Sequence, residues 1–283
     1  MIAKKMPLDC LVHAPCLEFN YYDQGSGEPL VFIHGLGGKA DSWRLQMEAL
    51  SNNYRVLAMD LRGHGQSGYR ADEPICIPAF ADDVVALLTK LGLDQAHICG
   101  LSLGGMIALE IFARCAPKVK SLIMADTTAF FQPPQAREEL LGHFDRLVMA
   151  SWAALLAGRI LRCEAPAELR QEVIQMLAAN RRALYRAGLV ATFDSDYRRV
   201  LPLIDLPTLI LVGEEDQATP IGYAEFLQAN IRGSVLQVIP QAAHLANLEN
   251  PAAFNRQLST HLKRCQEREK APPCANKAKP QKL

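Results

Sequence analysis

A serine at position 102 is placed so that it could act as a nucleophile. It lies in the motif Gly100-Leu-Ser-Leu-Gly-Gly105, between an apolar run over 95–100 and an apolar helical pattern over 106–115. Exposing a serine oxygen at the end of a strand requires a sharp turn with a strained backbone, and glycines on either side let the strand and the helix approach closely. The amino end of the helix supplies free N–H groups and a positive dipole. We therefore predict that Ser102 is a nucleophile beside a site that stabilises an anion.

A serine hydroxyl needs a general base, and the base needs an acid that fixes its tautomer. His244 lies in the loop that follows the last predicted strand, and we expect it to be the base. Asp216 follows the apolar run 209–213, and the chain order Ser102, Asp216, His244 is the order expected for this type of elbow. Other carboxylates at the same sheet edge remain open as the acid: Asp126 first, because it ends the preceding strand, and then Glu214 and Glu215.

A glycine-rich loop, His34-Gly-Leu-Gly-Gly38, follows an early predicted strand. An oxyanion hole needs two N–H donors, and we expect them to be the backbone N–H groups of Leu103, directly after the nucleophile, and of Leu36 in this loop. The glycine spacing differs from the Gly-x-Gly-x-x-Gly pattern of dinucleotide-binding folds. We therefore expect no cofactor.

Short buried strands alternate with helical patterns along the chain, which predicts an α/β fold with a mostly parallel central sheet and helices on both faces. The expected strands cover 17–22, 30–34, 54–60, 95–100, 119–126, 207–213 and 235–240, and helices are expected over 78–91, 106–115 and 251–263. Helical patterns over 136–161 and 167–187 interrupt the series of strands. We interpret residues 1–126 and 207–264 as one core, 127–206 as a helical lid inserted into it, and 265–283 as a disordered basic tail.

Aromatic residues of the lid segment are candidates for the wall of a substrate pocket: Trp152, Phe130 and Phe131. Packing between lid helices is the competing interpretation of these side chains. The same segment contains many arginines, one of which could bind a substrate carboxylate, although acidic residues are interleaved with them. The sequence therefore leaves open whether the pocket takes an acidic or an apolar acyl group.

The overall composition narrows the class of partner. Thirty basic and thirty acidic residues balance, and the sequence pI is near 7, so we expect neither nucleic acid nor an anionic membrane as a partner. No signal-peptide pattern and no run of about 18 apolar residues occurs, which predicts a cytoplasmic protein. The eight cysteines are scattered without metal-ligand spacing, so we expect free thiols and no metal site. Composition gives no oligomeric state.

Five motifs in this order resemble the α/β-hydrolase superfamily over most of residues 17–263: the loop at 34–38, Asp60-Leu-Arg-Gly-His-Gly-Gln-Ser67, the elbow at 100–105, Gly213-Glu-Glu-Asp216 and Ala243-His-Leu-Ala-Asn-Leu-Glu249. The elbow, the lid segment Met176-Leu-Ala-Ala-Asn180 with Tyr185, and the strand from Pro207 are similar to 3-oxoadipate enol-lactonases and related small esterases. The resemblance implies a small ester or lactone as substrate, hydrolysed through an acyl-enzyme on Ser102. The dipeptide His34-Gly35 differs from the Asn-Ser common in enol-lactonases and is typical of general esterases.

Two alternatives belong to other classes of protein. Hydrolases or lyases acting on carbon–carbon bonds share the fold, but they usually carry Asn before the nucleophile and Trp shortly after the base, where this chain has Leu101 and Leu245-Ala246. A slow-turnover ligand receptor of the same fold keeps the triad and signals through lid movement. Rapid multiple turnover on a small ester would exclude the receptor.

Overall fold

The structure, a computed structural model, describes residues 4–7, 18–131 and 134–270, and its centre is an eight-stranded sheet. The spatial order of the strands is β1-β2-β4-β3-β5-β6-β7-β8. From β4 across to β8 all neighbouring strands pair in parallel, whereas β1 and β2 pair antiparallel at one edge. The strands are β1 (Lys4–Pro7), β2 (Glu18–Gln24), β3 (Glu28–Ile33), β4 (Tyr54–Met59), β5 (Ala96–Leu101), β6 (Val119–Ala125), β7 (Thr208–Gly213) and β8 (Val235–Ile239).

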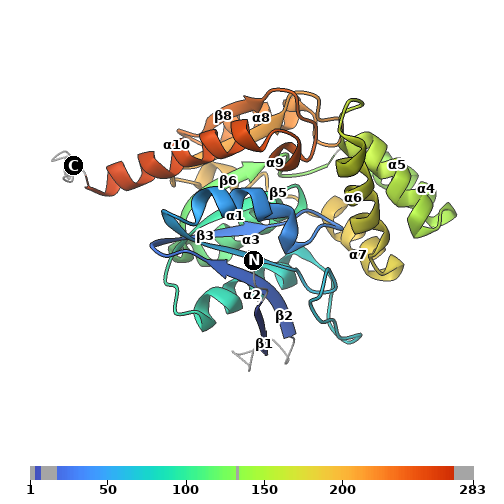
Figure 1. Ribbon diagram of the computed structural model, residues 1–283, viewed down its shortest axis with the longest axis horizontal. Coiled ribbons are helices and arrows are strands. Elements are labelled where there is room, and N and C mark those ends of the chain that lie inside the picture. Colours follow the sequence, from blue (N-terminus) through green and yellow to red (C-terminus); the bar gives the residue numbers. More distant parts are fainter. Residues whose placement is uncertain (1–3, 8–17, 132–133, 271–283) are drawn as a thin grey trace, which may run out of the picture.

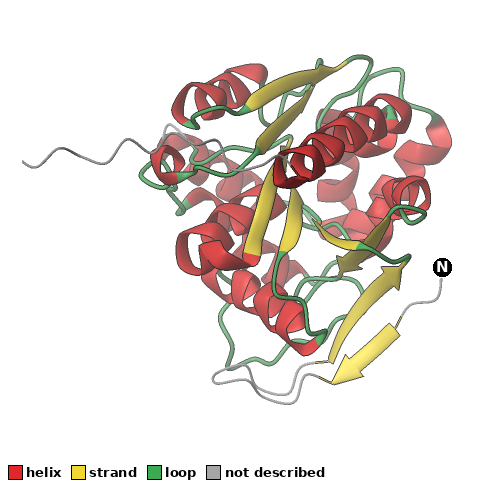
Figure 2. Cartoon of the chain, turned by 90° about the vertical axis from the view of Figure 1, so that its left-hand side faces the viewer, coloured by secondary structure: helices red, strands yellow, loops and turns green. Residues whose placement is uncertain are grey.

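Helices cover both faces of this sheet (Figures 1 and 2). Alternate residues of each strand point to opposite faces, so Val31 and Ile33 join one buried cluster while Leu30 and Phe32 join the other. The first cluster includes side chains of α2 (Ile77–Lys90), α3 (Leu103–Cys115) and α8 (Ile221–Asn230), and the second includes those of α1 (Arg44–Leu50), α9 (Ala246–Glu249) and α10 (Pro251–Lys270). The parallel strands β3 to β7 are therefore largely buried on both faces, as the apolar runs in the sequence predicted, whereas the edge strand β8 is only partly buried.

Four helices are inserted between two adjacent strands: α4 (Pro134–Arg146), α5 (Met149–Ile160), α6 (Ala167–Ala178) and α7 (Arg182–Phe193). They lie between β6 and β7 in the chain, yet these two strands pair directly, with Ile123 opposite Leu209. Figure 1 shows the four helices gathered at one end of the molecule. The fold is thus an α/β fold with a helical insertion, and we call these four helices the lid.

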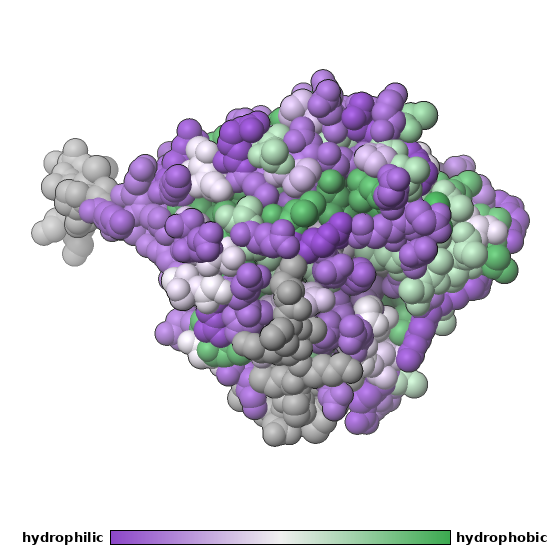
Figure 3. Space-filling view, viewed as in Figure 1, coloured by the Kyte–Doolittle hydropathy of each residue, from purple (hydrophilic) through white to green (hydrophobic). Residues whose placement is uncertain are grey.

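The C-terminal helix is longer than the sequence predicted. A tail was expected from residue 265, but α10 continues to Lys270. Cys265 is buried, Gln266 donates a hydrogen bond to Glu28, and Glu269 pairs with Lys120 at 2.9 Å. These contacts hold the final turns against the sheet. The residues at the end of α10 are hydrophilic, as Figure 3 shows, and for this reason the sequence alone predicted a tail. Residues 271–283 lie outside the described part of the chain.

The helices and the cysteines can be compared with the predictions made from the composition. Within the described residues, no helix combines the length and the apolar character needed to cross a membrane. The cysteines whose surroundings the structure describes carry free thiols: Cys76, Cys99, Cys115, Cys163 and Cys265. Cys10, Cys16 and Cys274 lie outside the described residues.

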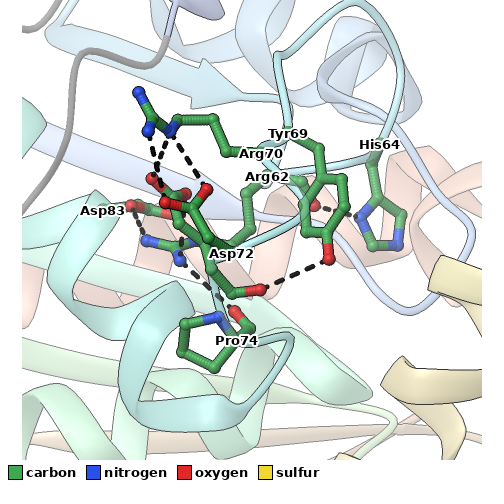
Figure 4. A network of polar contacts seen from close by, with 8 residues as sticks. Arg62, His64, Tyr69, Arg70, Asp72, Pro74 and Asp83 are labelled. Atoms are coloured by element: carbon green, nitrogen blue, oxygen red, sulfur yellow. Dashed lines mark hydrogen bonds and ion pairs between the residues drawn. The ribbon is translucent and has the colours of Figure 1, made fainter.

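A buried arginine ties the loop after β4 to α2 (Figure 4). Arg62 donates two hydrogen bonds to Asp83, at 2.6 and 2.5 Å, and a third to the carbonyl oxygen of Pro74 at 3.3 Å. Burial raises the pKa of Asp83 to about 6, although the neighbouring guanidinium lowers it. The carbonyl of Arg62 in turn accepts a hydrogen bond from Nδ1 of His64 at 3.1 Å. This network fixes the loop that lies beside the 34–38 segment.

We expect Arg62→Met to lower the free energy of unfolding by about 3–5 kcal/mol, because it leaves the Asp83 carboxylate buried without its partner. Urea denaturation at neutral pH measures this change. Arg70→Met is the matched control, since the Arg70 side chain is 50% exposed and its ion pair with Asp72 is worth about 1 kcal/mol or less. Equal losses for the two variants would show that the buried pair is not a main support of the loop.

Candidate active site

Ser102 occupies a strained turn between β5 and α3. Its φ is 55° and its ψ is −117°, outside the regions that a residue with a Cβ favours. The Ser102 N–H donates to the Ala125 carbonyl at 2.9 Å, and the Ser102 carbonyl accepts from Thr127 Oγ1 at 2.5 Å. A Cβ at Gly100 would collide with the backbone of Gly104, so only glycine lets the strand and the helix meet this closely. The elbow predicted from the glycine spacing is thus formed.

His244 and Asp216 lie in contact at the carboxyl edge of the sheet. Nδ1 of His244 and Oδ2 of Asp216 are 2.9 Å apart, and both residues are more than nine-tenths buried. Asp216 follows β7, and His244 lies in the loop between β8 and α9. The hydroxyl of Thr219 donates to Asp216 Oδ2 at 2.7 Å and lies 3.3 Å from His244 Nδ1. An ionised Asp216 in this place orients the imidazole so that Nε2 is the nitrogen left for chemistry.

The environment of Asp216 keeps its carboxylate charged. Burial by itself would raise the pKa of Asp216, but the charge of His244 and hydrogen bonds from His244 and Thr219 outweigh burial and lower the pKa to about 2. The backbone N–H groups of Ala218 and Thr219 add hydrogen bonds to Oδ1 at 2.8 and 3.0 Å. The acid is therefore an anion over the whole range in which a histidine titrates.

Asp126, the alternative acid, has a different set of contacts. It follows β6 with a φ of 45°, is fully buried, and accepts a hydrogen bond from the N–H of Gly213 at 2.7 Å. Burial, followed by the nearby charge of Asp216, raises the pKa of Asp126 well above its usual range. Asp126 thus holds the end of β7 through the N–H of Gly213, while the carboxylate hydrogen-bonded to His244 is that of Asp216.

The loop at 34–38 forms a tight turn against the elbow. The N–H of Gly38 donates to the Gly35 carbonyl at 3.0 Å and Gly37 has a φ of +76°, which are the features of a type II turn. Nδ1 of His34 donates to the same Gly35 carbonyl at 2.7 Å, and Nε2 of His34 accepts from the N–H of Leu61 at 3.0 Å. Burial lowers the pKa of His34 to about 4, so the ring stays neutral and keeps both hydrogen bonds at neutral pH. We call residues 35–38 the oxyanion turn.

One cavity of about 580 Å³ lies between the core and the lid and brings most of the predicted residues together. Ser102 and His244 line it, as do both predicted N–H donors, Leu36 and Leu103. Apolar side chains form most of its wall: Trp43, Leu140, Leu156, Ile160, Leu177, Leu189 and Leu245. The space is within the range of small-molecule sites, and its lining suits an apolar group beside a few polar atoms.

The three aromatic candidates from the lid segment have different places. Phe131 and Trp152 line the cavity. Phe130 is not among the lining residues, where it was predicted; it packs against Phe226, with ring centroids 5.0 Å apart. Both rings also pack against Tyr223 of the cavity lining, with centroids 5.9 Å from it for Phe130 and 5.8 Å for Phe131, so Phe130 lies one layer behind the wall.

The lid arginines are mostly engaged elsewhere. Arg137 pairs with Asp194, Arg162 with Glu215, and Arg186 with Asp145. Among the lid arginines, Arg159 lines the cavity, together with Glu139. The described residues of the lining therefore include both a positive and a negative side chain, and the cavity is not lined by charges of a single sign.

Thr219 was not predicted from the sequence, although a signal for it exists. The segment Asp216-Gln-Ala-Thr219 is an Asx-type turn, in which the aspartate accepts hydrogen bonds from N–H groups two and three residues later. A hydroxyl at the third position then reaches the same carboxylate. Thr127, which holds the Ser102 carbonyl, carried no such local signal, because the two residues are 25 positions apart.

The chain belongs to the α/β hydrolase fold family, whose model matches residues 28–251. Among curated relatives, 3-oxoadipate enol-lactonase 2 of Acinetobacter baylyi is 30% identical over 251 residues, which cover 88% of this chain and 93% of the relative. A thermophilic esterase from Thermogutta terrifontis superimposes with a TM-score of 0.85 at 26% identity and covers 94% of this chain and 99% of its own. The enol-lactonase of Burkholderia xenovorans has a TM-score of 0.81 at 25% identity, with 87% and 97% covered. The protein is a member of this hydrolase family.

Proposed function

We propose that the protein is a serine hydrolase that cleaves small carboxylic esters or lactones. The observation that carries the proposal is the 2.9 Å contact of His244 with an ionised Asp216, beside a cavity that both His244 and Ser102 line. An imidazole held by this carboxylate is a competent base for a serine hydroxyl. The similarity to two enol-lactonases and to an esterase supports ester or lactone as the substrate class.

In the proposed reaction, Ser102 Oγ attacks the substrate carbonyl carbon while Nε2 of His244 accepts the hydroxyl proton. The negative charge that forms on the carbonyl oxygen is stabilised by the N–H groups of Leu36 and Leu103. Collapse of the tetrahedral intermediate breaks the bond to the alkoxy oxygen, which leaves with the proton held by His244. Water, deprotonated by His244, then attacks the acyl-enzyme and forms a second tetrahedral intermediate. When this intermediate collapses, the bond to Ser102 Oγ breaks, His244 returns the proton to Ser102, and the carboxylic acid is released.

The cavity favours a neutral, mostly apolar acyl group over an acidic one. Leucines and aromatic rings make up much of its lining, while Arg159 and Glu139 bring charges of opposite sign to it. A carboxylate placed among the apolar side chains would lose its hydration without a dedicated partner. We therefore infer that the best substrates carry a short or medium aliphatic acyl chain.

A panel of p-nitrophenyl esters from acetate to decanoate, together with small lactones and an enol-lactone, tests this proposal. We expect multiple turnover, with kcat/KM for the preferred aliphatic chain at least about 100-fold above that of an equally long ester ending in a carboxylate, because an unpaired buried charge costs several kcal/mol. Preference for the carboxylated ester would assign the charged residues of the lining to substrate recognition. A single acylation event without turnover would favour a ligand receptor instead.

A further inference from the structure

The oxyanion turn is in contact with the lid, and this contact gives a role to the segment Met176–Asn180. Asn180 lies between α6 and α7, and its Nδ2 donates to the carbonyl oxygen of Gly37 at 2.9 Å. The same amide group lies 3.0 Å from the Met176 carbonyl and 3.1 Å from the Leu177 carbonyl, so the end of α6 fixes its direction. Asn180 therefore links the lid to the backbone of the turn.

Side chains of the lid also enclose the turn. A Cβ at Gly37 would collide with Tyr185 and Leu177, so both residues lie directly on the turn. A Cβ at Gly188 of α7 would collide with the side chain of Leu36, so this glycine makes room for the residue whose N–H we assign to the oxyanion hole. The turn is thus held on one side by His34 and on the other by the lid.

The geometry of the planar peptide bond connects Asn180 to the Leu36 N–H. In a trans peptide the C=O and the following N–H point in opposite directions. When Asn180 holds the Gly37 carbonyl, the Gly38 N–H is directed away from the lid, toward the Gly35 carbonyl that it contacts at 3.0 Å. The Gly35 carbonyl and the Leu36 N–H belong to one peptide group, so when the Gly35 carbonyl is held toward Gly38, the Leu36 N–H points in the opposite direction within the same peptide plane.

We propose that Asn180 is a positioning residue of the oxyanion hole, which makes the lid a part of the catalytic machinery and not only a cover for the substrate. The proposal rests on the proposed function, because it assigns the Leu36 N–H to the developing oxyanion. Docking of the lid then fixes the donor before the reaction begins, so that no reorganisation is needed when charge forms.

The test compares two inhibitors with the same aliphatic chain. A trifluoromethyl ketone adds reversibly to a serine hydroxyl, forming a C–O bond and an oxyanion that occupies the hole, whereas the matching secondary alcohol binds the pocket without forming an anion. The ratio of their inhibition constants therefore reports on the addition step, in which Ser102 Oγ bonds to the ketone carbon, its proton passes to His244 and the oxyanion enters the hole. In a variant that keeps Ser102 and His244, a change in this ratio reports on the oxyanion hole. We expect Asn180→Ala and the equally shaped Asn180→Asp to reduce this ratio about tenfold, part of the 10²–10³-fold loss typical of deleting a donor. We expect kcat to fall by a similar factor while KM changes little.

Glu172→Gln is the matched control. Glu172 of α6 forms a bidentate ion pair with Arg44, at 2.7 and 3.0 Å, and therefore joins the same lid helix to the core without touching the turn. We expect this variant to keep the inhibitor ratio of the wild type. Thermal melting of all three variants verifies that they are folded.

Two results would overturn the inference. The first is that both Asn180 variants keep the wild-type ratio of inhibition constants. The second is that Glu172→Gln reduces this ratio as much as they do, which would show that docking of the lid in general, and not Asn180, positions the Leu36 N–H. A wild-type protein that binds the ketone no better than the alcohol would instead refute the proposed serine chemistry, and the inference with it. The wild-type measurement thus separates the two failures.

Discussion

Replacing Ser102 by alanine is expected to lower kcat for a p-nitrophenyl ester by on the order of 10⁴–10⁶-fold, because the nucleophile, base and acid act as a unit. The variant should remain folded. The hydrogen bonds of Ser102 to Ala125 and Thr127 use its backbone N–H and carbonyl, which alanine keeps. Steady-state kinetics and thermal melting, measured together, test both parts of this prediction.

Labelling with a fluorophosphonate gives an independent measure. We expect the wild type to be labelled at Ser102, as located by mass spectrometry, and the alanine variant to remain unlabelled. Ser151→Ala serves as a control, because Ser151 is exposed on α5 and lies outside the cavity lining. Retained turnover in the Ser102 variant, or a label on another serine, would remove Ser102 from the proposed mechanism.

The acid provides the second large effect. We expect Asp216→Asn to lower kcat about 10⁴-fold at neutral pH, because an amide that donates to His244 stabilises the wrong tautomer and gives no charge to balance the imidazolium. The loss of the hydrogen bond from Thr219 to a carboxylate adds to this effect. The measurement is kcat across pH 5–9, where Asp216, with a pKa of about 2, is ionised in the wild type.

Asp126→Asn is the matched comparison for this variant. We expect it to cost no more than about tenfold in kcat, because burial and the charge of Asp216 raise the pKa of Asp126 and so favour its neutral form, which an asparagine resembles in shape and charge. Its oxygen can still accept the hydrogen bond from Gly213. The opposite order of effects would transfer the role of triad acid to Asp126.

The strands and the elbow could be predicted from the sequence because their requirements are local. A buried parallel strand needs a short apolar run, and the turn at Ser102 needs glycine at positions 100 and 104, so each leaves a mark within a few residues. Other features were not predictable in this way. The end of α10 has the polar sequence of a disordered tail. It is helical because it contacts Glu28 and Lys120, which lie far away in the chain and leave no local signal.

The sequence by itself determined the fold family, the elbow at Ser102 and the chain order of the three candidate triad residues, because these follow from short-range patterns. Only the tertiary structure decided which carboxylate meets His244, that Phe130 packs against Phe226 and does not line the cavity, and that Asn180 reaches the oxyanion turn. Asn180 and Gly37 are 143 positions apart, and their contact depends on how the inserted helices dock on the core. Side-chain direction and long-range docking are set by packing of the whole chain, and no local pattern of residues encodes them.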